Sequence, residues 1–248
     1  VILPDYRLAG VSKGKDGKLH NPYNVTSALE FVQIACEDII SATNYTLSQN
    51  WNINPKIVCL AGGSAGAITA LQTEYDLCNG VEYTKKLPKD FNYTGIISQA
   101  GAIATLTDSL TWKGKPCPIM MMHGTEDKNV PIDSEKIGDT FFMGPYRIVP
   151  TLADMDNSYW KFIVTGADHV IAMLGLTDWY GQQMEFLQQF VLQPMPQNIE
   201  TSVNPKTPPR MSSVEDMIKY VPLYILGYDK YLNEVNLSDC KMPKSIVY

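Results

Sequence analysis

Four short apolar segments of the chain are rich in β-branched or other large apolar residues, and each ends in a turn signal. The segments are 56–60, 93–98, 118–122 and 160–164. Segments of this length that are apolar throughout are typical of strands buried on both faces of a sheet. The pattern therefore predicts four buried strands.

Helical patterns lie between and after these strands. Apolar residues recur at helix spacing at Ala28, Phe31, Val32, Ala35, Ile39 and Ala42. A second helical pattern covers residues 179–192, where Met184, Leu187 and Val191 share one face. Strands that alternate with helices predict an α/β fold, with a mostly parallel sheet flanked by helices.

The pattern changes after Gln193, where several prolines interrupt a polar stretch. Because proline lacks a backbone donor, we expect a linker here rather than helix or sheet. A capping-box pattern at residues 212–215 then predicts a C-terminal helix, interrupted near Pro222. The expected organisation is a core over residues 1–193, followed by a Pro-rich linker and helical tail over residues 194–248.

Composition narrows the class of protein. The chain has 248 residues, enough for one large α/β domain, and a net charge of -6. Clusters of lysine and arginine are absent, so nucleic acid is not an expected partner. No apolar run approaches the roughly 20 residues of a membrane span. A secreted or periplasmic location is the working expectation.

Five scattered cysteines and three histidines form no metal-binding pattern. No metal or other cofactor is therefore predicted. The chemistry is expected to come from side chains alone.

The segment Gly62-Gly63-Ser64-Ala65-Gly66 follows a predicted strand and opens a helical pattern. This G-x-S-x-G context is that of a nucleophile on a sharp turn, where flanking residues must be small because strand and helix backbones approach closely. Ser64 is therefore the candidate nucleophile. The backbone amide of Ala65, at the start of the helix, is the candidate oxyanion donor.

A serine hydroxyl needs a general base, and three histidines are available. His20 precedes Ser64, whereas hydrolases with such a turn place nucleophile, acid and histidine in that order along the chain. His123 directly follows a strand and is expected to bond to its own turn. His169 follows the last predicted strand, in a loop that can overhang the end of the sheet. His169 is the candidate base.

The acid that orients the base should lie between Ser64 and His169, in the loop after the preceding strand. Asp127 meets this condition. Glu126 is its neighbour, and Asp108 is an outside candidate. A loop-capping role for Asp127 remains the structural alternative.

Three segments together resemble the α/β-hydrolase superfamily, closest to its carboxylesterase and acetyl or feruloyl esterase branch, which grades into prolyl-oligopeptidase-like hydrolases. They are Asp5-Tyr6-Arg7-Leu8-Ala9, the turn at Ser64, and His123-Gly124-Thr125-Glu126-Asp127 with the residues up to Pro131. The resemblance implies a triad of Ser64, Asp127 and His169. A similarity to esterase-like proteins of gut and rumen Bacteroidetes implies plant polysaccharide side groups as substrates.

The chain departs from this family at its start. In the family, three strands and a glycine-rich loop that supplies a second oxyanion donor precede the segment that resembles residues 5–9. One of those strands lies beside the nucleophile's strand. The resemblance therefore implies an N-terminally incomplete sheet, which an upstream segment or a second chain would complete.

The expected function is that of a serine esterase acting on a small-molecule or saccharide ester through an acyl-enzyme. Two alternatives remain open at this stage. One is a peptidase of the prolyl-oligopeptidase type, and the other is a binding module that kept the fold and lost activity.

Overall fold

The computed structural model describes residues 1–7, 12–13, 19–20, 27–175 and 177–211. The chain divides into two compact units, residues 1–209 and residues 210–248. The first unit holds all the elements described below. The predicted C-terminal helix lies outside the described residues.

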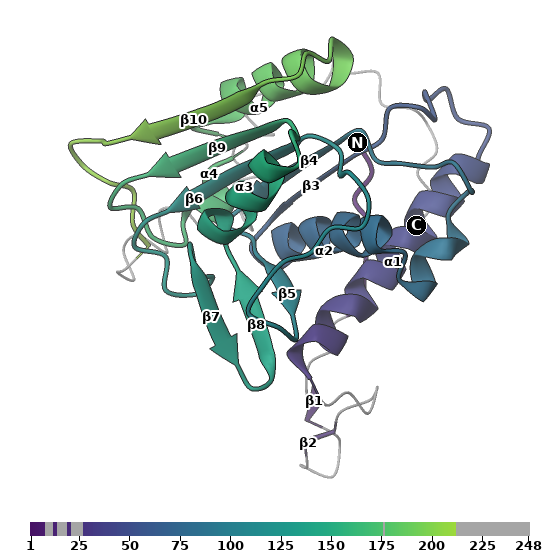
Figure 1. The fold of residues 1–248 in the computed structure, drawn as a ribbon, viewed down its shortest axis with the longest axis horizontal. Helices are drawn as coiled ribbons and strands as arrows, with labels where there is room; N and C mark the ends of the chain where they lie inside the picture. Colours follow the sequence, from purple (N-terminus) through teal and green to yellow (C-terminus); the bar gives the residue numbers. More distant parts are fainter. Residues whose placement is uncertain (8–11, 14–18, 21–26, 176, 212–248) are drawn as a thin grey trace, which may run out of the picture. The chain divides into compact units, whose positions relative to one another are not determined.

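A five-stranded sheet forms the centre of the first unit (Figure 1). Its strands run in the order β10-β9-β6-β4-β3, and every neighbouring pair is parallel. Their bounds are β3 Cys59–Gly63, β4 Gly95–Gln99, β6 Ile119–Gly124, β9 Tyr159–Val164 and β10 Asn198–Val203. Four of these strands are the predicted ones, so the expected fold class, a mainly parallel sheet flanked by helices, is confirmed.

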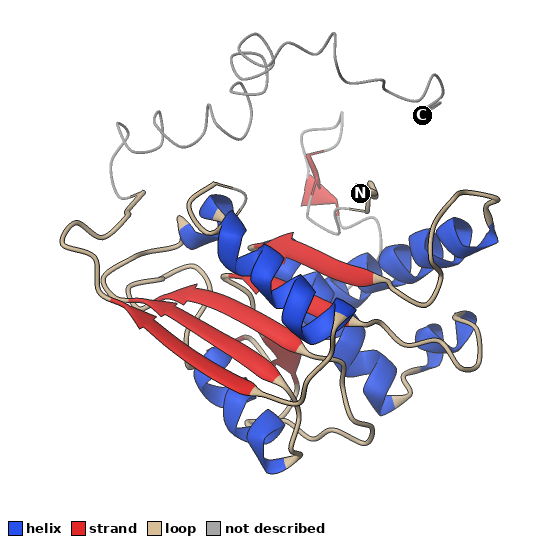
Figure 2. Cartoon of the chain, turned by 90° about the horizontal axis from the view of Figure 1, so that it is seen from above, coloured by secondary structure: helices blue, strands red, loops and turns tan. Residues whose placement is uncertain are grey.

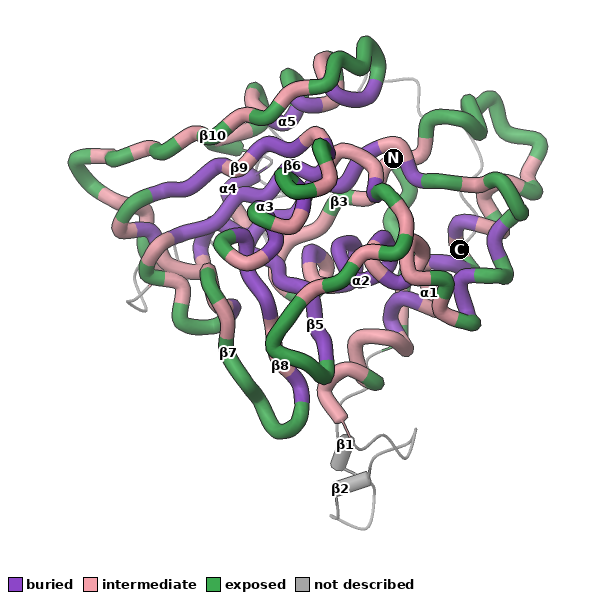
Figure 3. The backbone as a smooth tube through the Cα atoms, viewed as in Figure 1, coloured by how far each residue is buried: buried purple, intermediate pink, exposed green. Residues whose placement is uncertain are grey.

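Side chains of the central strands alternate between two cores, one on each face of the sheet. Ile96, Ile119 and Met121 pack in one cluster, whereas Met120 and Met122 pack in the other. A strand points successive side chains to opposite faces, so a strand that is apolar throughout requires apolar cover on both sides. Figure 3 shows β4 and β6 buried along their length.

Helices supply this cover on both faces (Figure 2). The first core includes residues of α1 (Ala28–Ser48), α2 (Ala65–Asn79) and α3 (Pro145–Asp154). The second includes residues of α4 (Ile171–Leu174), α5 (Tyr180–Phe186) and the π-helical turn η2 (Leu187–Leu192). The two predicted helical patterns thus correspond to α1 and to α5 with η2. Ser27 begins α1 with a capping box to Glu30.

Strand β10 corrects the prediction that the chain after Gln193 forms neither helix nor sheet. Its exposure alternates, with Ile199, Thr201 and Val203 less exposed than the residues between them. Ile199 and Val203 pack against the second core. The prolines of this region lie before and after β10 rather than within it, so they leave its ladder to β9 intact. The sheet therefore extends past the predicted boundary at residue 193.

Several smaller elements were not predicted. An antiparallel sheet has the order β5-β8-β7, with β5 Ile103–Thr105, β7 Ser134–Ile137 and β8 Thr140–Met143. A two-stranded pair joins β1 (Ser12–Lys13) to β2 (Leu19–His20). The short helix η1 (Glu82–Lys86) follows α2.

Strand β3 lies at one edge of the parallel sheet and is paired with β4. An apolar groove of about 420 Å³ runs beside it, lined by β3 residues such as Cys59 and Leu60, by α1, and by Val1, Ile2 and Pro4. Among the described residues, no second strand pairs with β3. The groove therefore borders a free strand edge.

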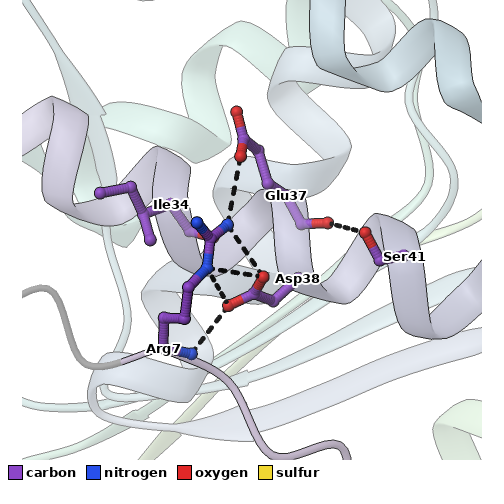
Figure 4. A network of polar contacts seen from close by, with 5 residues as sticks. All are labelled: Arg7, Ile34, Glu37, Asp38 and Ser41. Carbon is purple, nitrogen blue, oxygen red and sulfur yellow. Dashed lines mark hydrogen bonds and ion pairs between the residues drawn. The ribbon is translucent and has the colours of Figure 1, made fainter. Parts of the chain in front are cut away.

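Arg7 holds the first residues of the chain against α1 (Figure 4). Its backbone N–H and its Nε both donate to the carboxylate of Asp38, at 2.7 Å and 2.9 Å. Its Nη2 also lies 3.2 Å from Glu37 Oε2. These contacts hold the start of the chain so that Val1, Ile2 and Pro4 line the groove.

Glu74 lies on α2 with 2% of its surface exposed. One carboxyl oxygen, Oε1, accepts the backbone N–H of Cys117 at 2.7 Å, whereas Oε2 has no partner among the described residues. Burial raises the pKa of Glu74 above its ordinary value, against a smaller opposing effect of the Cys117 hydrogen bond. The neutral acid is thus favoured in the folded chain.

We expect Glu74→Gln to change how stability depends on pH. Because the pKa is higher in the folded than in the unfolded state, the wild-type protein loses stability as pH rises from about 4.5, the ordinary glutamate value, to the raised value. The glutamine variant lacks this loss. Melting temperatures measured between pH 4 and pH 8 should diverge with rising pH in favour of the variant. Parallel curves would contradict this account.

Candidate active site

Ser64 occupies the turn between β3 and α2 in a strained backbone conformation. Its φ is 54° and its ψ is -122°, in a region that non-glycine residues rarely adopt. The backbone N–H of Ser64 donates to Gln99 O at 2.9 Å, and this bond ties the turn to the end of β4. The predicted strand-turn-helix setting of Ser64 is present.

Close backbone contacts explain the glycines before Ser64. A Cβ on Gly62 would lie 2.3 Å from the backbone carbon of Gly66, at the start of α2. A Cβ on Gly63 would lie 2.1 Å from Ala172 O, in α4. The turn is thus packed against α2 behind it and α4 beside it.

His169 lies in the loop that connects β9 to α4, and its ring contacts Ser64. The distance from His169 Nε2 to Ser64 Oγ is 2.7 Å, and that from His169 Nδ1 to Asp127 Oδ2 is 2.8 Å. An ionised carboxylate only accepts, so Nδ1 carries the proton and donates to Asp127. Nε2 is then free to accept the hydroxyl proton of Ser64.

Asp127 is fixed by backbone donors as well as by His169. Its Oδ1 accepts the N–H groups of Asn129 at 2.9 Å and Val130 at 3.0 Å, and its side chain is fully buried. Burial alone would raise the pKa of Asp127, but the hydrogen bonds from His169, Val130 and Asn129 outweigh burial and lower it. The donors lie two and three residues after Asp127, the spacing of a side-chain turn, so Asp127 caps its own loop as well as bonding to His169.

The loops that carry Asp127 and His169 are joined to each other by their backbones. The N–H groups of Thr125 and Glu126 donate to Val164 O and Ala167 O, and Thr125 Oγ1 accepts from the N–H of Gly166. A Cβ on Gly124 would lie 2.3 Å from Ala167 O, so this contact requires glycine. Hydrogen bonds at the ends of β6 and β9 therefore hold the loops of Asp127 and His169 together.

Ala65 is the first residue of α2, directly after Ser64. The first N–H groups of a helix lack acceptors within the helix, and the helix dipole gives them positive character. The amide of Ala65 therefore stays the candidate oxyanion donor.

Among the described contacts, neither Glu126, Asp108 nor His123 is hydrogen-bonded to Ser64. Glu126 is exposed, and Asp108 forms an exposed ion pair with Arg147 at 3.1 Å. His20 lies in β2. His123 is buried and bonds to its own turn, through Nε2 and Val130 O at 3.0 Å, as the sequence predicted.

Among the residues that the structure describes, no cluster of three His, Cys, Asp or Glu side chains could hold a metal ion. In the same residues, no helix combines the length and apolar character that a membrane crossing requires.

Comparison with known proteins gives structural resemblances only. No protein-family model matches the chain, and no curated protein sequence does. The chain is similar to esterase PE8 at 23% identity and a TM-score of 0.44, covering 63% of this chain and 62% of that one. It is similar to Est2 of the planctomycete Thermogutta terrifontis at 16% identity and a TM-score of 0.43, covering 71% and 69%. It is also similar to the acylaminoacyl peptidase of Pyrococcus horikoshii at 14% identity and a TM-score of 0.47, covering 66% and 29%.

We expect Gly62→Ala and Gly66→Ala to differ sharply, although they lie four residues apart. The first places a methyl group against α2 and should cost about 1–3 kcal/mol of unfolding free energy. The second has no neighbour within 4 Å and should be neutral or stabilising, since alanine favours a helix over glycine by about 0.5–1 kcal/mol. Chemical denaturation of both variants checks this, and equal losses would contradict the packing described.

Proposed function

We propose that this chain is a serine hydrolase that cleaves carboxylic esters with Ser64 as nucleophile, His169 as general base and Asp127 as the residue that orients His169. The observation that carries the proposal is the continuous hydrogen-bonded series from Ser64 Oγ through both ring nitrogens of His169 to Asp127 Oδ2. A serine is inert without a base within hydrogen-bond reach, and the base requires a partner that fixes its tautomer. Both requirements are met here.

In the proposed reaction, Ser64 Oγ attacks the ester carbonyl while its proton passes to His169 Nε2. The carbonyl oxygen becomes an oxyanion that accepts a hydrogen bond from the Ala65 amide. His169 then gives its proton to the departing alkoxide, and the bond between the carbonyl carbon and that oxygen breaks. Water then attacks the acyl carbon while His169 Nε2 takes its proton. The bond between the acyl carbon and Ser64 Oγ breaks, and His169 returns the proton to Oγ, which releases the acid and restores Ser64.

The buried carboxylate stabilises the histidine when it becomes positively charged. Asp127 stays ionised because three hydrogen bonds hold its pKa below the ordinary range. A permanent negative charge beside Nδ1 favours the imidazolium that forms as Ser64 loses its proton. This arrangement favours an enzyme over a binding module, because only a reaction at Ser64 would form the imidazolium that Asp127 stabilises.

The substrate we propose is a small-molecule or saccharide ester, with acetyl or feruloyl groups of plant polysaccharides as the specific class. The resemblance of the segments around Ser64 and Asp127 to acetyl and feruloyl esterases motivates this choice. A peptidase of the prolyl-oligopeptidase type would use the same three residues and is the second candidate.

Turnover of Ser64→Ala should fall by several orders of magnitude, because the nucleophile is lost. For Asp127→Asn we expect a loss of about 10⁴-fold, because the amide favours the wrong tautomer of His169. Hydrolysis of p-nitrophenyl acetate measures both. Ser48→Ala, at the exposed end of α1, is the matched control and should leave turnover unchanged. Activity retained by Ser64→Ala would exclude the proposed nucleophile.

A substrate panel distinguishes the ester and peptide alternatives. We expect acetyl or feruloyl esters to give a higher kcat/KM than a peptidyl amide with the same chromogenic leaving group. The reverse order would favour the peptidase.

We further propose that an extended segment pairs with the free edge of β3 in the functional enzyme. Val58 O accepts from Thr94, just before β4, and the Ser64 N–H donates to Gln99 at the end of β4. Alternation along the strand therefore turns the N–H groups of Cys59, Ala61 and Gly63 away from β4, toward the free edge. Unpaired edges of this kind favour pairing with another strand. A strand parallel to β3 would end at the same edge of the sheet as Ser64, where its following loop could supply a second oxyanion donor.

Residue-resolved hydrogen exchange tests the free edge. In the chain of 248 residues, the amides of Cys59, Ala61 and Gly63 should exchange much faster than those of Leu60 and Gly62, which face β4. Uniform protection along 59–63 would show that the edge is already covered, and would refute the need for an added strand.

A further inference from the structure

The proposed reaction leaves one buried titratable side chain beside the acid unused. His123, the penultimate residue of strand β6, is 0% exposed. Its Nε2 lies 3.0 Å from Val130 O and 3.5 Å from Asp127 Oδ2, whereas Nδ1 has no partner among the described residues. A buried polar atom without a hydrogen-bond partner lowers the stability of the folded chain. If packing were the only role of this position, an apolar residue would suit it better.

The contacts of His123 define its protonation state. Val130 O can only accept, so Nε2 carries a proton and donates to it. Burial lowers the pKa of His123, against smaller opposing effects of Val130 and Asp127, and the neutral ring is favoured. In this tautomer Nε2 donates its proton to Val130 O, and Asp127 Oδ2 lies 3.5 Å from the same nitrogen.

Val130 connects His123 to Asp127 through its backbone carbonyl and its backbone N–H. Its carbonyl accepts from His123 Nε2, and its N–H donates to Asp127 Oδ1. The hydrogen bond from His123 therefore fixes the residue that holds one oxygen of Asp127. With Oδ1 held by Val130 and Asn129, Oδ2 is left facing His169 at 2.8 Å.

We propose that His123 is a positioning residue that holds the acid loop, through Val130, in the geometry that directs Asp127 Oδ2 at His169. This inference rests on the proposed function of Asp127. A neutral His123 is part of the role, because a positive charge 3.5 Å from Oδ2 would compete with His169 for the same carboxylate. His123 itself touches neither Ser64 nor the reacting atoms.

The test compares His123→Met, which keeps the approximate volume but has no donor, with His123→Gln, whose amide can donate to Val130 O. For the methionine variant we expect kcat for p-nitrophenyl acetate to fall about 10- to 100-fold, since misplacing a catalytic group by about 1 Å can cost 10²-fold. KM should stay within about twofold, because substrate binding is not altered. The glutamine variant should recover most of the lost kcat.

A double-mutant cycle separates positioning from general stability. If His123 acts through Asp127, His123→Met should have almost no further effect on kcat in an Asp127→Ala background. An equal loss in both backgrounds, or a methionine variant with wild-type kcat, would overturn the proposal. If the methionine variant does not fold, His123→Asn, whose shorter amide does not reach Val130, replaces it in the same cycle.

A fluorophosphonate probe distinguishes failure of this inference from failure of the proposed function. Labelling of Ser64 in the wild-type chain, with no difference between the methionine and glutamine variants in labelling rate or kcat, would refute the role of His123 alone. A wild-type chain that neither labels nor hydrolyses the ester would refute the proposed function and this inference with it.

Discussion

The close packing of β3 against α2 and α4 is the constraint on which the rest of the site depends. Gly62 and Gly63 have no room for a Cβ, because the backbones of Gly66 and Ala172 lie where it would be. The chain must therefore reverse at Ser64 in a conformation with φ of 54°. Packing of the two cores on either side of the sheet offsets this backbone strain. The conformation leaves the hydroxyl of Ser64 beside His169 and the start of α2.

A parallel sheet brings its strand ends together at one edge, and the three candidate residues use that property. Ser64, Asp127 and His169 follow β3, β6 and β9, which are far apart in sequence. Strand β4 separates β3 from β6, and its last residue, Gln99, binds the backbone of Ser64. Backbone hydrogen bonds between the loops after β6 and β9 then fix the spacing of Asp127 and His169. The site is thus held by main-chain contacts more than by side-chain packing.

The parts of this structure that follow from local pattern could be predicted from the sequence, and those that depend on distant partners could not. The apolar segments around Ile96, Met120 and Phe162 indicated buried strands, and chain order selected Asp127 and His169.

The antiparallel sheet of β5, β8 and β7 joins short segments whose pairing is non-local, so no local period reveals it. Strand β10 was missed because its flanking prolines outweighed the alternation of Ile199, Thr201 and Val203. The sequence indicated that His123 bonds to its own turn, but the role proposed for it depends on which carbonyl accepts that bond, and residue type does not specify this.

The proposed function requires covalent chemistry at Ser64. The most direct measurement is rapid acid quenching of the chain during turnover of an acetyl ester, followed by peptide mapping and mass spectrometry. We predict an acetyl group on the peptide that contains Ser64, present during turnover and gone once the substrate is consumed. Turnover without any acyl-enzyme, or an acetyl group that forms and disappears on a different residue, would contradict the assignment of Ser64 as the nucleophile.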